Sequence, residues 1–105
     1  MLRLKQVHQF DALANVTYPD GKEATFTVKF TMLGVKEFNT LIEVGDVAAL
    51  KAVIVGWADL IDDATDQEVP FNPDNLELLL DILPHRTALF TAYFKAITEG
   101  ARKNS

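Results

Sequence analysis

Hydrophobic and polar residues alternate with a period of two in the first third of the chain. The even positions of residues 10–18 and of residues 24–32 are apolar or aromatic, and the positions between them are mostly polar. This alternation predicts two β-strands, each with one face toward a core. The turn-forming sequence Pro-Asp-Gly at residues 19–21 separates them, so we expect an antiparallel hairpin within residues 1–33.

The parity of the two apolar rows predicts the register of this hairpin. Even residues must lie opposite even residues if both rows are to share one face. A three-residue loop meets this requirement, with Pro19 and Asp20 in a type I turn and Gly21 in the left-handed conformation, whereas a two-residue loop does not. The loop places Val16 opposite Ala24.

From residue 35 onward, apolar residues recur at the three- and four-residue spacing of amphipathic helices. The first expected helix covers residues 35–44 and ends at Gly45, and the second begins at Asp46. The sequence leaves two alternatives for where the second helix ends. Its apolar stripe reaches Trp57 and beyond, but it can also stop near Trp57 and leave Leu60 facing Val69 across a small hairpin.

The third helix has the best start in the sequence. Asn72 suits an N-cap, Pro73 suits the first helical position, and Phe71 and Leu76 have the spacing of a hydrophobic staple. We expect this helix over residues 73–83, ended by Pro84 and with Leu83 on its buried face. The fourth helix is expected from about residue 85 to residue 100, with fraying of residues 101–105.

These elements predict a single α+β domain over residues 1–105. An N-terminal antiparallel β-hairpin (1–33) is followed by a bundle of about four helices (35–101) with an acidic loop at 59–70.

The hydrophobic share of 49% and charged share of 24% are typical of a globular protein. With no cysteine there is no thiolate chemistry. No apolar run is long enough to span a membrane, and the first residues do not form a signal peptide.

The net charge of −5 repels phosphate, and no local basic patch offsets it, so we expect no nucleic-acid partner. The clustered carboxylates of the acidic loop lack the spacing of a calcium site and are interpreted as a solvated turn. His8 and His85 belong to no metal-spaced pair or catalytic triad. We therefore expect no catalytic, cofactor or metal site, and a protein that is not an enzyme.

The aromatic residues are the candidates for partner binding. Trp57 is more often a core residue at such spacing, but Phe90, Tyr93 and Phe94 give the last helix a wider apolar stripe than one core contact needs. The candidate partner-binding residues are therefore Trp57, Phe71, Phe90, Tyr93 and Phe94.

The stretch from residue 47 to residue 104 resembles the tail assembly chaperones of long-tailed bacteriophages and prophages. The resemblance rests on Gly56-Trp57, an acidic turn, Val-Pro-Phe at residues 69–71, Asn-Pro-Asp-Asn-Leu at residues 72–76, a leucine-rich helix, a proline and an aromatic helix ending in Lys-Asn. The chain departs from the family's pattern in the acidic turn, where Ala-Thr-Asp at residues 64–66 lacks the usual glycine.

The resemblance implies a non-catalytic helper in the cytoplasm of the bacterial host, absent from the mature virion. It would bind the tape-measure protein, promote assembly of the tail tube, contact the tail-tube protein and associate with itself. It also implies a minor longer product made by a frameshift near residues 103–105. A small regulatory or antitoxin-like interaction adaptor is the alternative, although the chain has neither a basic recognition helix nor a clear neutralising tail.

Overall fold

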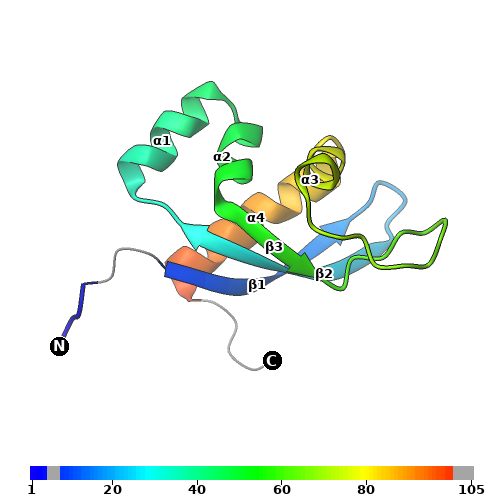
Figure 1. The fold of residues 1–105 in the computed structure, drawn as a ribbon, viewed down its shortest axis with the longest axis horizontal. Coiled ribbons are helices and arrows are strands. Elements are labelled where there is room, and N and C mark those ends of the chain that lie inside the picture. Colours follow the sequence, from blue (N-terminus) through cyan, green and yellow to red (C-terminus); the bar gives the residue numbers. More distant parts are fainter. Residues whose placement is uncertain (5–7, 101–105) are drawn as a thin grey trace.

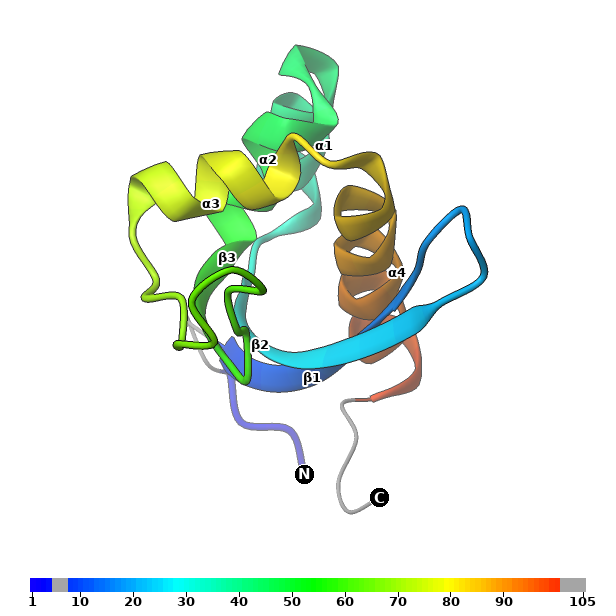
Figure 2. The same cartoon turned by 90° about the vertical axis from the view of Figure 1, so that its right-hand side faces the viewer.

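A curved three-stranded antiparallel sheet carries four helices on one side (Figures 1 and 2). The computed structural model describes residues 1–4 and 8–100. Its elements in chain order are β1 (His8–Thr17), β2 (Glu23–Met32), α1 (Val35–Val44), α2 (Asp46–Val53), β3 (Ile54–Ala58), α3 (Pro73–Leu80) and α4 (Leu83–Glu99). The predicted α+β class is confirmed, and a third strand is added to the expected hairpin. The predictions for residues 101–105 lie outside the described residues.

The β1–β2 hairpin has the predicted register. Val16 lies opposite Ala24, and ten residue pairs follow one another without a bulge. The N–H of Tyr18 donates to the carbonyl oxygen of Lys22 at 2.8 Å, and the N–H of Gly21 donates back to the carbonyl oxygen of Tyr18 at 2.9 Å. Gly21 has φ of 88°, a left-handed conformation that favours glycine.

The even-numbered face of the hairpin forms the floor of the hydrophobic core. Its centre is fully buried, and α4 packs across it and along β1. The opposite face consists mainly of threonine and other polar residues, and Figure 2 shows that no helix covers it. One sheet face therefore supplies the core, as the alternation of residue types requires.

The segment after α2 differs from the predicted helix. The α-helix ends at Val53, and residues Ile54–Ala58 form β3, which pairs antiparallel with β2 so that Trp57 lies opposite Val28. The prediction of helix through Ile54 to Trp57 is thus wrong. Val53, Ile54 and Val55 are β-branched and favour extended backbone, and the free edge of β2 supplies the hydrogen bonds that stabilise it.

The acidic loop forms a small hairpin of its own. The N–H of Val69 donates to the carbonyl oxygen of Leu60 at 2.8 Å, which confirms the pairing left open by the sequence. At its tip Asp66 has φ of 59°. Aspartate tolerates the left-handed conformation better than most residues, so this turn forms without a glycine.

The helix boundaries confirm one predicted start and correct one end. Asn72 caps α3, because its Oδ1 accepts a hydrogen bond from the N–H of Asn75 at 2.8 Å. However, α3 ends at Leu80, and Leu83 is the first residue of α4 with 64% of its surface exposed. Pro84 lies in the first turn of α4, where its missing N–H costs nothing, so it begins the last helix instead of following the third.

Candidate partner-binding surfaces

Tyr93, one of the candidate binding residues, lies at the centre of the core. Only 1% of its surface is exposed. Its ring contacts Phe30 of β2 at a centroid distance of 5.4 Å and stacks on Phe38 of α1 at 5.3 Å. Its hydroxyl oxygen accepts a hydrogen bond from the N–H of Leu33 at 3.3 Å, and burial raises the pKa of this phenol. Tyr93 therefore has no surface with which to contact a partner.

Phe90 and Phe94 lie one turn apart on α4, with Phe90 partly buried against the core and Phe94 more exposed. Their rings stack at a centroid distance of 6.0 Å and an interplanar angle of 8°, and 42% of the Phe94 surface is exposed. Phe38 of α1 meets the Phe94 ring edge-on at 5.4 Å. We call Phe38, Phe90 and Phe94 the aromatic platform. An open hollow next to it is lined by both phenylalanines of α4 and by polar residues of the same helix, including Lys95.

Phe38 is a member of the platform that the sequence did not single out. Its position in the apolar stripe of residues 35–44 predicts burial against the rest of the domain, and it is in fact buried. The apolar periodicity of a helix predicts its buried face but not the element that packs against that face. The contact between Phe38 and Phe94 could therefore not be predicted from the sequence. Ile42, one turn further along the same face of α1, is partly exposed and extends the apolar character of this surface.

Trp57 and Phe71 form a separate aromatic pair. The indole N–H of Trp57 donates to the carbonyl oxygen of Val69 at 2.8 Å, and the Trp57 ring packs edge-to-face with Phe71 at 4.8 Å. Trp57 is half-buried, whereas 38% of the Phe71 surface is exposed. The five candidate residues thus belong to two groups on different elements.

Beside this pair opens a cleft of about 650 Å³ between the start of β3 and α3. We call it the β3–α3 cleft, and it is lined by Lys51, Ile54, Val55, Phe71, Pro73, Asp74, Leu76 and Glu77. Phe71 and Leu76, the two residues of the predicted staple, both line it. Most of the side chains that line the cleft are apolar, and three are charged: Lys51, Asp74 and Glu77.

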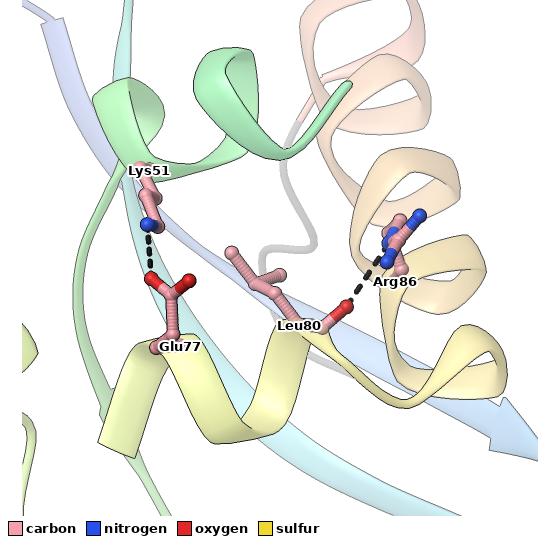
Figure 3. Close-up of polar contacts among 4 residues, drawn as sticks. All are labelled: Lys51, Glu77, Leu80 and Arg86. Atoms are coloured by element: carbon pink, nitrogen blue, oxygen red, sulfur yellow. Dashed lines mark hydrogen bonds and ion pairs between the residues drawn. The ribbon is translucent and has the colours of Figure 1, made fainter. Parts of the chain in front are cut away.

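Two polar connections join α3 to its neighbouring helices (Figure 3). The ammonium group of Lys51 on α2 pairs with the carboxylate of Glu77 on α3. The guanidinium Nε of Arg86 on α4 donates to the carbonyl oxygen of Leu80 at 3.0 Å, at the C-terminal end of α3. The second bond satisfies a carbonyl that the helix itself leaves unpaired. The position of α3 is therefore fixed from both neighbouring helices.

The acidic residues have structural roles in the loop. Asp62 Oδ1 accepts hydrogen bonds from the N–H groups of Ala64 at 2.8 Å and Thr65 at 3.3 Å, and Asp59 Oδ2 accepts one from the hydroxyl of Thr27 at 3.3 Å. Within residues 1–4 and 8–100, no group of three or more histidine, cysteine or acidic residues lies close enough to hold a metal ion.

His85 connects the hairpin to the junction of α3 and α4. Its Nε2 accepts a hydrogen bond from the hydroxyl of Tyr18 at 2.7 Å, and its Nδ1–H donates to the carbonyl oxygen of Leu79 at 3.3 Å. Burial lowers the pKa of His85, which favours the neutral ring that accepts from the Tyr18 hydroxyl. His85 thus has a structural partner on each side of its ring, whereas His8 is exposed on β1.

Comparison of the chain with models of known protein families, with curated proteins and with solved structures finds no match in any of the three. In the part of the chain that the structure describes, no helix has both the length and the apolar character needed to cross a membrane.

Proposed function

We propose that this protein is a non-catalytic tail assembly chaperone of a long-tailed phage or prophage, which binds the tape-measure protein while the tail tube assembles around it. The aromatic platform is the observation that carries this proposal. It presents stacked phenylalanine rings at the surface of a domain whose core already contains several buried aromatic residues. The sequence resemblance supplies the class of client.

The platform has the chemistry that an apolar helical client requires. A long tape-measure helix exposes apolar stripes at three- and four-residue spacing before the tube encloses it, and such stripes aggregate in water. Aromatic rings on a folded surface cover them with large apolar area and little loss of side-chain freedom. The net charge of −5 favours the solubility of a client covered by many bound copies.

The platform and the β3–α3 cleft are the two apolar surfaces that the client could contact, and we assign the client to the platform. Phe90 and Phe94 of α4 supply its accessible apolar surface, and the buried Phe38 of α1 supports the Phe94 ring through an edge-on contact. The cleft, in contrast, is bordered by the ion pair of Lys51 and Glu77 and by Asp74, whose charges a purely apolar stripe would have to desolvate.

The experiment compares two glutamate substitutions at similarly exposed phenylalanines. Phe94→Glu on the platform should abolish co-purification with the tape-measure protein, because a carboxylate in a desolvated apolar contact is strongly unfavourable. Phe71→Glu beside the β3–α3 cleft is the matched control and should leave the complex intact. Circular dichroism and thermal unfolding of both variants establish that each is folded.

Loss of the complex with Phe71→Glu alone would move the client to the cleft. Retention with both folded variants would contradict a role for either surface. Failure of the parent protein to bind the tape-measure protein at all would contradict the chaperone function.

A further inference from the structure

The two edges of the sheet are protected to different degrees. β3 is five residues long, the register shifts where it pairs with Lys29 and Phe30, and the carbonyl of Val69 lies beside it, bonded to Trp57. β1 is ten residues long, contains neither proline nor lysine, and runs beside β2 without a bulge. Proteins usually protect a free strand edge with such devices, because an unprotected one pairs with another chain.

The hydrogen-bonding groups on the outer edge of β1 follow from the hairpin register. Tyr18 directs its N–H to the carbonyl of Lys22, and its own carbonyl accepts from Gly21, so both groups point toward β2. In an antiparallel ladder this direction alternates from residue to residue. Even residues of β1 therefore bond to β2. The outward N–H and C=O groups belong to the odd residues Gln9, Asp11, Leu13, Asn15 and Thr17.

We propose that β1 pairs antiparallel with β1 of a second copy of this chain, about a two-fold axis through Leu13. The sheets of both copies then join into one, and the proposal is independent of the chaperone function. An axis through a residue places odd residues opposite odd residues, so that all outward groups can bond. The axis at Leu13 sets the two leucines opposite each other and each Asp11 opposite Asn15 of the second copy.

Other axes along β1 give poorer pairs. An axis at Asp11 sets two carboxylates opposite each other, which is destabilising. An axis at Ala12 sets Leu13 opposite a carboxylate. Leu13 is the large apolar side chain on the otherwise polar face of β1, and 37% of its surface is exposed. Pairing Leu13 with its own copy therefore buries apolar surface that the isolated domain exposes.

Two hollows border the outer edge of β1. A hollow between Leu13 on the strand and Ala92 and Ala96 on α4 borders one part of the edge, and a second hollow between Thr17 and Leu83 borders the end near the turn. The exposed Leu83 lies where the second copy would cover it.

The first test is a proline that affects only the outer edge. In the full chain, Leu13→Pro removes an outward N–H and leaves every bond to β2 in place, because proline is tolerated where the N–H faces away from the sheet. Sedimentation equilibrium should show the parent as a dimer and Leu13→Pro dissociating about a hundredfold more readily. Leu13→Ala, which keeps the N–H, should weaken the dimer less than about tenfold.

The second test distinguishes the register without changing the backbone. Asn15→Asp places a carboxylate opposite Asp11 of the second copy and should weaken the dimer about tenfold, whereas Asn15→Lys should strengthen it by a similar factor. Asn15 is exposed on the open face of the hairpin, so both variants should fold like the parent. This pair also keeps the proposal falsifiable if Leu13→Pro does not fold.

Three results would overturn the proposal. The first is a parent chain that remains monomeric at all concentrations, which would mean that another segment or a different partner covers β1. The second is a dimer that is indifferent to Leu13→Pro when that variant is folded. The third is an equal response to Asn15→Asp and Asn15→Lys, which would place the axis elsewhere.

Discussion

Two aromatic groups of this protein have similar composition and different environments. Around Tyr93, rings from three further elements converge: Phe10 of β1, Phe30 of β2 and Phe38 of α1. Around Trp57 of β3, the one ring partner among residues 1–4 and 8–100 is Phe71, from the segment just before α3, and the indole N–H donates to the carbonyl oxygen of Val69. Tyr93 is fully buried and Trp57 is half-buried.

The difference shows that burial of an aromatic residue depends on how many elements meet around it. The largest ring of the chain is that of Trp57, and yet it lies on the edge strand β3. Tyr93 carries a hydroxyl and is still buried, because the N–H of Leu33 donates to that oxygen. The Tyr93 group should therefore dominate stability, and the following changes test that ranking.

Tyr93→Ala should have the largest effect, a loss of about 3 to 5 kcal/mol in the free energy of unfolding, because it leaves a cavity among four elements. Tyr93→Phe is the matched control, since it removes only the hydroxyl and should cost about 1 kcal/mol. Urea denaturation measures both. A Tyr93→Ala loss below that of Tyr93→Phe would contradict the central position of this ring.

Trp57→Ala should cost about 2 to 3 kcal/mol, less than Tyr93→Ala, because part of the ring is already in water. Trp57→Phe keeps most of the ring and loses the hydrogen bond to Val69, so it should cost about 1 kcal/mol. In the parent, Trp57 fluorescence should be blue-shifted and only partly protected from acrylamide quenching. Complete protection of Trp57 fluorescence from acrylamide would place the Trp57 ring in the core, and the two aromatic groups would then not differ in burial.

His85 and Tyr18 form a third ring pair, in edge-to-face contact at 5.5 Å, and should show the smallest effect. Burial lowers the pKa of His85 below 6.5 in the folded state. The unfolded chain therefore binds the proton first as the pH falls, which favours unfolding. The stabilising contribution is complete above about pH 6.5 and is lost as the pH decreases through the lowered pKa.

Urea denaturation at a series of pH values between 7.5 and 5 measures this loss. His85→Gln should reduce the decrease in stability over this range, because glutamine does not titrate. An unchanged decrease in the variant would mean that other groups account for the pH dependence.

The hairpin and the start of α3 show how much could be predicted locally. Strict alternation and a Pro-Asp-Gly turn leave one register that keeps both apolar rows together, and Val16 indeed pairs with Ala24. The cap at Asn72 depends on its own side chain and on an amide three residues away. The alternation of apolar residues is sufficient for the hairpin register, and the cap joins two residues that are three positions apart.

The candidate site was predicted less completely, because it depends on contacts between distant elements. The sequence pointed to Phe90, Tyr93 and Phe94 together, but it could not tell that the middle residue meets Phe38 and enters the core while the others remain nearer the surface. It also grouped Trp57 and Phe71 with them. In the structure Trp57 lies on β3, the strand that pairs with β2, and its ring contacts Phe71 instead of the rings of α4.

The sequence by itself determined the hairpin, its register, the limits of α1 and the cap of α3, since local backbone preferences and apolar periodicity are sufficient for these. Only the tertiary structure decided that Ile54–Ala58 is a strand, because its spacing fits a helix and the free edge of β2 settles the competition. The tertiary structure also decided which rings are buried, since burial is set by the elements that converge on a residue and not by its own position in a helix or strand.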